Sequence, residues 1–239
     1  MQATPSSGPS PHSDGRLHAR PALRGQMLRT DAPPQPLEPG THQLTFADGR
    51  KALLHAPPNP DDHALPLLVM LHGAGGQHGG GDNIALAYAM LRGCLLLIPD
   101  ALSTSWDMLR GGFGADLAFL DRALAWTMQR YDVAPHAIGI GGFSDGASYA
   151  LSVGLMNGDL FSDILAFSPG FIAPLRRVGQ PRIFVAHGLS DKVLSVELGR
   201  GIARKLADED YEVRYAEFDG AHVVEPLVAA EALQRLPVG

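Results

Sequence analysis

Two kinds of apolar pattern alternate along the chain after about residue 40. Leu65–Leu71 and Cys94–Ile98 are apolar throughout, as expected of strands that are buried on both faces of a sheet. Residues 115–130 instead carry apolar side chains three to four positions apart, which predicts a helix. The same patterns predict further strands at Ala137–Gly141, Ile164–Phe167, Arg182–Ala186 and Glu212–Phe218, and further helices at Asn83–Leu91, Ala147–Met156, Leu194–Leu206 and Pro226–Leu236.

Short apolar strands that alternate with helices predict an α/β fold, in which a mostly parallel central sheet is covered by helices on both faces. An antiparallel hairpin is expected before it, because His42–Phe46 and Lys51–Ala56 flank a turn that contains Asp48-Gly49. Ligands of such sheets bind outside the carboxyl ends of the strands. The residues that follow each strand are therefore the candidates for function.

Residues 1–40 differ from the rest of the chain, since they are rich in Pro, Ser, Gly and Arg. They contain no apolar run long enough for the core of a signal peptide. We expect this segment to be mostly disordered or loosely attached, and residues 41–239 to form one folded domain. No stretch of about 18 apolar residues occurs, so no membrane span is expected. A cytoplasmic location is the default expectation.

The composition excludes few other classes of protein. The chain of 239 residues has a net charge of −6, with no basic excess that would indicate nucleic-acid binding. Its one cysteine, Cys94, cannot form an internal disulfide. Cys94 begins an apolar run, which favours a buried hydrophobic role over a reactive thiol.

The motif Gly142-Phe143-Ser144-Asp145-Gly146 follows a predicted strand and opens a predicted helix. In that context a G-x-S-x-G sequence indicates a nucleophile elbow, in which a tight turn projects the serine hydroxyl. The following helix directs backbone N–H groups toward a developing oxyanion. A glycine-rich turn with a helix-capping serine is the alternative, because the pattern alone is weak in a chain with 28 glycines.

Three other loops that follow predicted strands carry matching residues. Ala74 lies in a Gly-rich loop that can supply an oxyanion-hole N–H together with that of Asp145. Asp191 follows the next-to-last predicted strand and is a candidate to orient a histidine, or simply to cap the next helix. His222 follows the last strand and is the candidate general base, with a surface-loop histidine as the alternative.

The order Ser144, Asp191, His222 is the order of catalytic groups in the α/β-hydrolase fold. On these motifs, residues 65–236 resemble α/β-hydrolase esterases related to phospholipase/carboxylesterases, acyl-protein thioesterases, and feruloyl or polyhydroxybutyrate esterases. The resemblance implies a serine esterase that hydrolyses small-molecule esters through an acyl-enzyme. The chain departs from the pattern of these families at Asp145, where thioesterase-like relatives usually have a neutral Gln-type residue. This carboxylate would oppose an oxyanion unless it points away.

The sequence leaves the substrate-binding residues and the exact activity open. Trp106, Phe171 and Leu194 are candidate substrate-binding residues, although Trp106 could equally pack its loop. The short segment between Ser168 and Gln180 leaves no room for a long lid and indicates an open site. The mechanism requires no metal or organic cofactor. A thioesterase, a lysophospholipase, and a non-catalytic binding module with the same fold are alternatives, and the sequence does not predict the oligomeric state.

Overall fold

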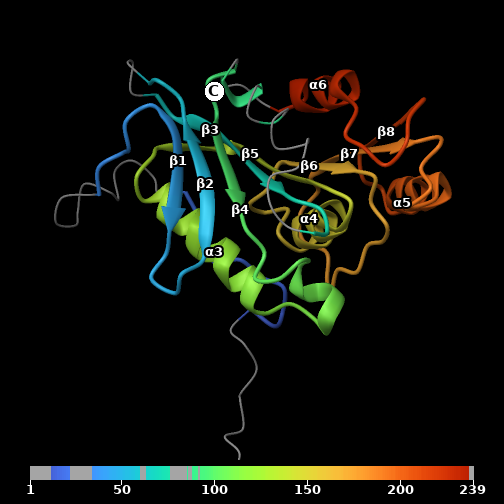
Figure 1. Ribbon diagram of the computed structural model, residues 1–239, viewed down its shortest axis with the longest axis horizontal. Coiled ribbons are helices and arrows are strands. Elements are labelled where there is room, and N and C mark those ends of the chain that lie inside the picture. The colour runs from blue at the N-terminus through green and yellow to red at the C-terminus, as the bar shows by residue number, and fades with distance from the viewer. Residues whose placement is uncertain are drawn as a thin grey trace, which may run out of the picture.

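The computed structural model describes residues 12–21, 34–59, 63–75, 85, 88–90 and 92–236, and within them the chain forms one eight-stranded sheet. The order across the sheet is β1-β2-β4-β3-β5-β6-β7-β8. The first three strands in this order pair antiparallel, and all later neighbours pair parallel (Figure 1). The strands are β1 (Gly40–Thr45), β2 (Lys51–Ala56), β3 (Leu65–Leu71), β4 (Leu95–Pro99), β5 (Val133–Phe143), β6 (Asp163–Phe167), β7 (Arg182–Gly188) and β8 (Val213–Phe218).

The helices cover both faces of this sheet. Alternate strand residues belong to two separate apolar clusters, as the two-residue period of a strand requires. One cluster joins a face of the sheet to α3 (Ala115–Met128), α4 (Asp145–Met156) and α5 (Val196–Asp208). The other joins the opposite face to α6 (Pro226–Gln234) and to the described part of residues 85–92. A short 3₁₀ helix, η1 (Asp107–Arg110), precedes α3.

The expected mostly parallel sheet with an antiparallel hairpin is confirmed, and the boundaries differ at a few ends. β5 begins at Val133 rather than at Ala137, and its pairing with β3 contains an irregularity near its start. α5 begins after Ser195, whose hydroxyl caps the helix by accepting from the Glu197 N–H. The helix expected at Asn83–Leu91 lies largely outside the described residues. No helix in the described part of the chain is long and apolar enough to span a membrane.

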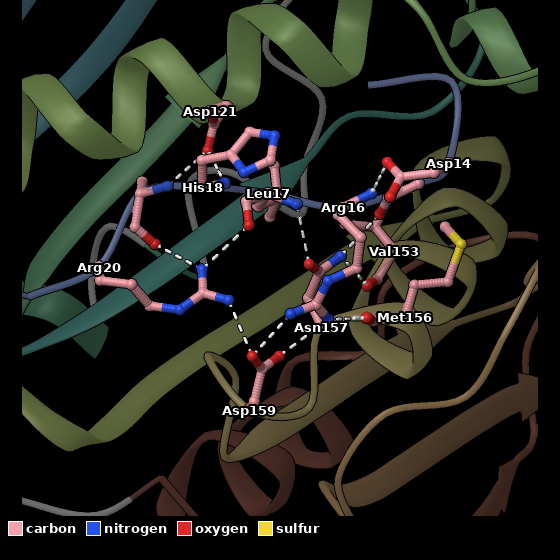
Figure 2. Close-up of polar contacts among 12 residues, drawn as sticks. Asp14, Arg16, Leu17, His18, Arg20, Asp121, Val153, Met156, Asn157 and Asp159 are labelled. Carbon is pink, nitrogen blue, oxygen red and sulfur yellow. Dashed lines mark hydrogen bonds and ion pairs between the residues drawn. The ribbon is translucent and has the colours of Figure 1, made fainter. Parts of the chain in front are cut away.

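Residues 12–21 form a strap that is docked on the domain, although we expected residues 1–40 to be loosely attached. Leu17 is 1% exposed and belongs to the core cluster on the side of α3 and α4. The buried side chain of Asn157 accepts from the Leu17 N–H at 2.9 Å and donates to the Gly15 carbonyl at 2.9 Å (Figure 2). The strap is thus held by backbone pairing with a buried amide, which composition does not reveal.

Ion pairs fasten the strap to the carboxyl end of α4. Arg16 and Arg20 both contact the carboxylate of Asp159, at 2.7 and 2.8 Å, and Arg16 also donates to the Met156 carbonyl (Figure 2). Hydrogen bonds from Arg16, and then from Arg20, lower the pKa of Asp159 to about 2 against the opposing effect of burial. Asp121 of α3 accepts from two further strap N–H groups, those of residues 18 and 19.

Candidate active site

Ser144 occupies a sharp turn between β5 and α4. Its backbone has φ 56° and ψ −119°, a conformation that side-chain-bearing residues rarely adopt. The flanking glycines allow this turn, because a Cβ on Gly142 would lie 2.4 Å from the backbone of Gly146, and one on Gly146 would lie 2.2 Å from the Leu71 carbonyl oxygen. The strand, the turn and the helix therefore approach more closely than any other residue type permits.

The structure brings Ser144, His222 and Asp191 together in one hydrogen-bonded chain. His222 Nδ1 lies 2.6 Å from Asp191 Oδ2, and His222 Nε2 lies 2.9 Å from Ser144 Oγ. An ionised carboxylate can only accept, so Nδ1 carries the imidazole proton and Nε2 is free to accept from the serine hydroxyl. The ring of Phe143 lies 4.7 Å from the ring of His222 and supports its orientation. This is the geometry in which an imidazole can remove a hydroxyl proton.

The side chain of Asp191 is fully buried, yet its charge is well satisfied. Burial alone would raise its pKa, but the Leu194 N–H, His222 and the Val193 N–H all donate to the carboxylate and together lower the pKa. Oδ1 accepts from both backbone groups at 2.8 and 2.9 Å. Asp191 is therefore an anion at neutral pH, held in one orientation facing His222.

Backbone hydrogen bonds join the loop that carries Asp191 to the loop that carries His222. Leu189 N–H donates to the Phe218 carbonyl and Ser190 N–H to the Gly220 carbonyl, each at 2.9 Å. The two loops are so close that a Cβ on Gly188 would lie 2.4 Å from the Ala221 carbonyl oxygen. The relative position of the carboxylate and the imidazole is thus fixed by main-chain pairing as well as by their own contact.

The loop after β3 lies directly against the nucleophile turn. A Cβ on Gly73 would be 3.3 Å from Ser144 Cβ, and the next residue, Ala74, is exposed at the site. His72 shapes this loop: its Nδ1 donates to the Gly73 carbonyl at 2.8 Å, and its Nε2 accepts from the Ala101 N–H at 3.0 Å. Both ring nitrogens are engaged, so His72 holds the loop containing Ala74 against the loop after β4.

Asp145 directs its carboxylate to a neighbour in the loop after β4. Ser105 Oγ donates to Asp145 Oδ2 at 2.7 Å. The carboxylate, which could oppose an oxyanion, is thereby engaged by a hydroxyl of a different loop. The Asp145 N–H belongs to the first turn of α4, where backbone donors lack helical partners. Nothing in the pattern of the sequence pointed to Ser105.

Trp106 is part of the hydrophobic core. Its side chain is 1% exposed, stacks on Tyr149 with ring centroids 5.0 Å apart, and donates from Nε1 to the His72 carbonyl at 2.9 Å. The sequence left open whether Trp106 binds substrate or packs its loop, and this burial favours packing. The sequence contained no signal for this, because an apolar indole serves either purpose.

Phe171 and Leu194 are half-buried residues of two neighbouring loops. The Leu194 side chain lies against Gly170, where a Cβ would be 3.4 Å from both of its terminal carbons. The segment containing Phe171 is attached to α4, since Gly170 N–H donates to the buried Ser148 Oγ at 2.9 Å. These two side chains remain candidates for the wall of a binding site.

The described residues contain no group of three or more His, Cys, Asp or Glu side chains that could hold a metal ion. Cys94 is buried, and burial raises the pKa of its thiol to about 12.

Comparison with known proteins identifies the class of fold. No protein-family model matches the chain, and no curated protein matches its sequence. Solved structures do match: a thermostable esterase (TM-score 0.62, 24% identity, covering 75% of this chain and 54% of that one) and esterase PE8 (TM-score 0.60, 23% identity, covering 83% and 97%). A third is the ferulic acid esterase AmCE1/Fae1A of Anaeromyces mucronatus, solved with ferulic acid (TM-score 0.61, 16% identity, covering 92% and 98%).

These likenesses show an α/β-hydrolase-like fold, whose solved neighbours are esterases at low sequence identity. The chain spans about half the length of the thermostable esterase and nearly the whole length of the other two. The resemblance to α/β-hydrolase esterases that the motifs indicated is therefore confirmed at the level of structure.

Proposed function

We propose that this protein is a serine hydrolase that cleaves carboxylic esters, with Ser144 as the nucleophile. The observation that supports this most strongly is the continuous chain from Ser144 Oγ to His222 to Asp191, with contacts of 2.9 and 2.6 Å. Strained backbone and titratable groups with buried charge partners cluster at functional sites, and this site combines both. Esterases among the structural neighbours agree with this chemistry.

The reaction follows from the roles of the three side chains. His222 Nε2 takes the proton of Ser144 as Oγ attacks the ester carbonyl carbon, and it then donates that proton to the departing alcohol oxygen. A water molecule then attacks the acyl carbon as the same nitrogen takes its proton, the bond to Ser144 Oγ breaks, and His222 returns the proton to Oγ as the acid leaves. Asp191 stabilises the imidazolium formed in both halves and keeps the correct nitrogen protonated.

The N–H groups of Ala74 and Asp145 are the proposed donors to the oxyanion of each tetrahedral intermediate. Gly73 lies against Ser144, and Asp145 follows Ser144 at the start of α4, so both donors belong to segments that adjoin the nucleophile. Loss of one such donor typically reduces kcat by about 10²–10³. The Ser105 hydroxyl donates to the Asp145 carboxylate and thereby offsets part of the negative charge beside the proposed oxyanion donors.

Small or extended esters are the proposed substrates. The β6–β7 connection is attached to α4 through Ser148 and Ser152, whose hydroxyls accept from the N–H groups of Gly170 and Ala173. A short connection held in this way leaves the nucleophile without a long covering insertion on that side. The ferulic acid complex of one neighbour supports a substrate of similar size.

The experiment is hydrolysis of p-nitrophenyl esters of increasing acyl length, and of a matching thioester, by wild type and Ser144→Ala. Ser162→Ala is the matched control, since Ser162 immediately precedes β6 and its hydroxyl donates to Asp163 at 2.7 Å. We expect activity and fluorophosphonate labelling in wild type and Ser162→Ala, and neither in Ser144→Ala with an unchanged circular dichroism spectrum. Wild type that is folded but inactive and unlabelled would contradict the proposal and favour a binding module.

A further inference from the structure

His187 is a buried histidine close to Asp191 whose contacts the proposed mechanism does not use. It lies near the end of β7, continues the row of Ile183 and Val185, and faces α5 with no exposed surface. Its Nε2 lies 2.9 Å from the Leu194 carbonyl oxygen and 3.3 Å from Asp191 Oδ2, the oxygen that also receives His222.

The protonation of this ring follows from its neighbours. The Leu194 carbonyl oxygen can only accept, so Nε2 carries the proton and donates it to that carbonyl, with the Asp191 carboxylate as a charged neighbour of the same nitrogen at 3.3 Å. Nδ1 then holds a lone pair, and this buried nitrogen has no hydrogen-bond partner among the residues that the structure describes. A buried nitrogen without a hydrogen-bond partner lowers the stability of the folded protein. Its presence here indicates that the contacts of the other ring nitrogen compensate for this cost.

The contacts of His187 Nε2 hold the loop that carries Asp191. The Leu194 N–H donates to Asp191 Oδ1 while the Leu194 carbonyl accepts from His187, so Leu194 is fixed on both sides of its peptide unit. The carboxylate in turn accepts from two backbone N–H groups on Oδ1 and from His222 on Oδ2, and His187 Nε2 lies 3.3 Å from Oδ2. We infer that His187 is a positioning residue that fixes Asp191, and through it His222, in the orientation needed for proton transfer from Ser144.

Helix α5 holds the ring in place. A Cβ on Gly199 would lie 2.6 Å from His187 Nδ1 and 3.1 Å from its Cβ and Cγ, so the backbone of the helix lies directly on the imidazole. On the neighbouring strand β8, Glu217 is the register partner of His187. Its carboxylate is paired with Arg200 of α5 at 2.6 Å. Gly201, in the same helix, faces open space and has no such neighbour.

This inference rests on the proposed function, and active-site titration separates the two. Wild type, His187→Phe, His187→Gln, Gly199→Ala and Gly201→Ala are compared by kcat and KM per site labelled with a fluorophosphonate. Phe keeps the ring without its donor, whereas Gln retains an N–H at about the distance of Nε2. Wild type that shows no labelling and no hydrolysis would refute the proposed function itself.

With wild type active, we expect His187→Phe to lower kcat about 10- to 100-fold with KM within about twofold, as small displacements of catalytic groups do. His187→Gln should regain most of this loss. Gly199→Ala should lower kcat while Gly201→Ala leaves it unchanged, since only the former presses on the ring. Equal kcat for His187→Phe and wild type, or equal loss in the Phe and Gln variants, would overturn the inference. If His187→Phe does not fold, the Gly199→Ala and Gly201→Ala pair decides, and equal kcat for these two would overturn it.

Discussion

Leu17 offers a direct test of whether the strap of residues 12–21 belongs to the folded domain. Its side chain is 1% exposed and is packed in the cluster of α3 and α4. Burial of a leucine side chain stabilises a protein by about 1.5–3 kcal/mol, and Leu→Ala in a core costs about 2–5 kcal/mol because a cavity remains. The strap lies at the edge of the domain and can partly close over the cavity. We therefore expect Leu17→Ala to cost about 2–3 kcal/mol.

Thermal unfolding followed by circular dichroism measures this loss. For a chain of this length each kcal/mol lowers Tm by about 2–4 °C, so the expected decrease is about 4–12 °C. Urea titration should give a lower midpoint at an unchanged m value. Leu227→Ala is the matched control, because Leu227 is 80% exposed on α6. Coincident melting of the two variants would refute the docking of the strap.

Three further outcomes follow from the structure. Asp191→Asn should lower kcat by about 10⁴ in p-nitrophenyl ester hydrolysis at an unchanged fold, because an amide no longer fixes the protonated nitrogen of His222; a loss below tenfold would argue against Asp191 in this role. Trp106→Ala should lower the stability measured by urea titration by about 3–5 kcal/mol without altering acyl-length preference, and the reverse result would restore Trp106 as a pocket residue. Arg16 and Arg20 lower the pKa of Asp159 from 3.8 to about 2, so the stability that these ion pairs contribute is complete above pH 3.8 and is lost as the pH falls to about 2. The Tm difference between wild type and Asp159→Asn should therefore narrow over that pH range. A constant difference would contradict the assignment.

The sequence carried enough information for the sheet and for the three residues that meet in the site. Continuous apolar runs mark strands that are buried on both faces, and each candidate residue directly follows one of them, as Asp191 follows β7. Because parallel strands end at one edge of the sheet, residues far apart in the chain could be expected to meet there. The strained turn at Ser144 was predictable for a similar reason, since the glycines on either side are visible in the sequence.

Contacts between loops were not predictable in the same way. The hydroxyl of Ser105 bonds Asp145, and the buried amide of Asn157 pairs with the strap, but neither residue stands in a periodic pattern or a motif. Proline-rich composition led us to expect loose attachment of residues 1–40, whereas Leu17 and two arginines dock residues 12–21. Specific pairs of this kind depend on three-dimensional proximity, which composition does not encode.

The site consists of two bodies, and the hydrogen-bonded loops after β7 and β8 form the first of them. Asp191 and His222 lie on segments that main-chain hydrogen bonds join, so they form one connected body. Ser144 belongs to a second body, anchored by its N–H to the Phe167 carbonyl of β6 at 2.9 Å and by helix α4. The two bodies meet where His222 contacts Ser144 Oγ and the ring of Phe143, and where Leu194 lies against Gly170. A displacement of the loops after β7 and β8 relative to β5 would therefore change the distance between Ser144 Oγ and His222 Nε2, on which proton transfer depends, while the contact between Asp191 and His222 is retained.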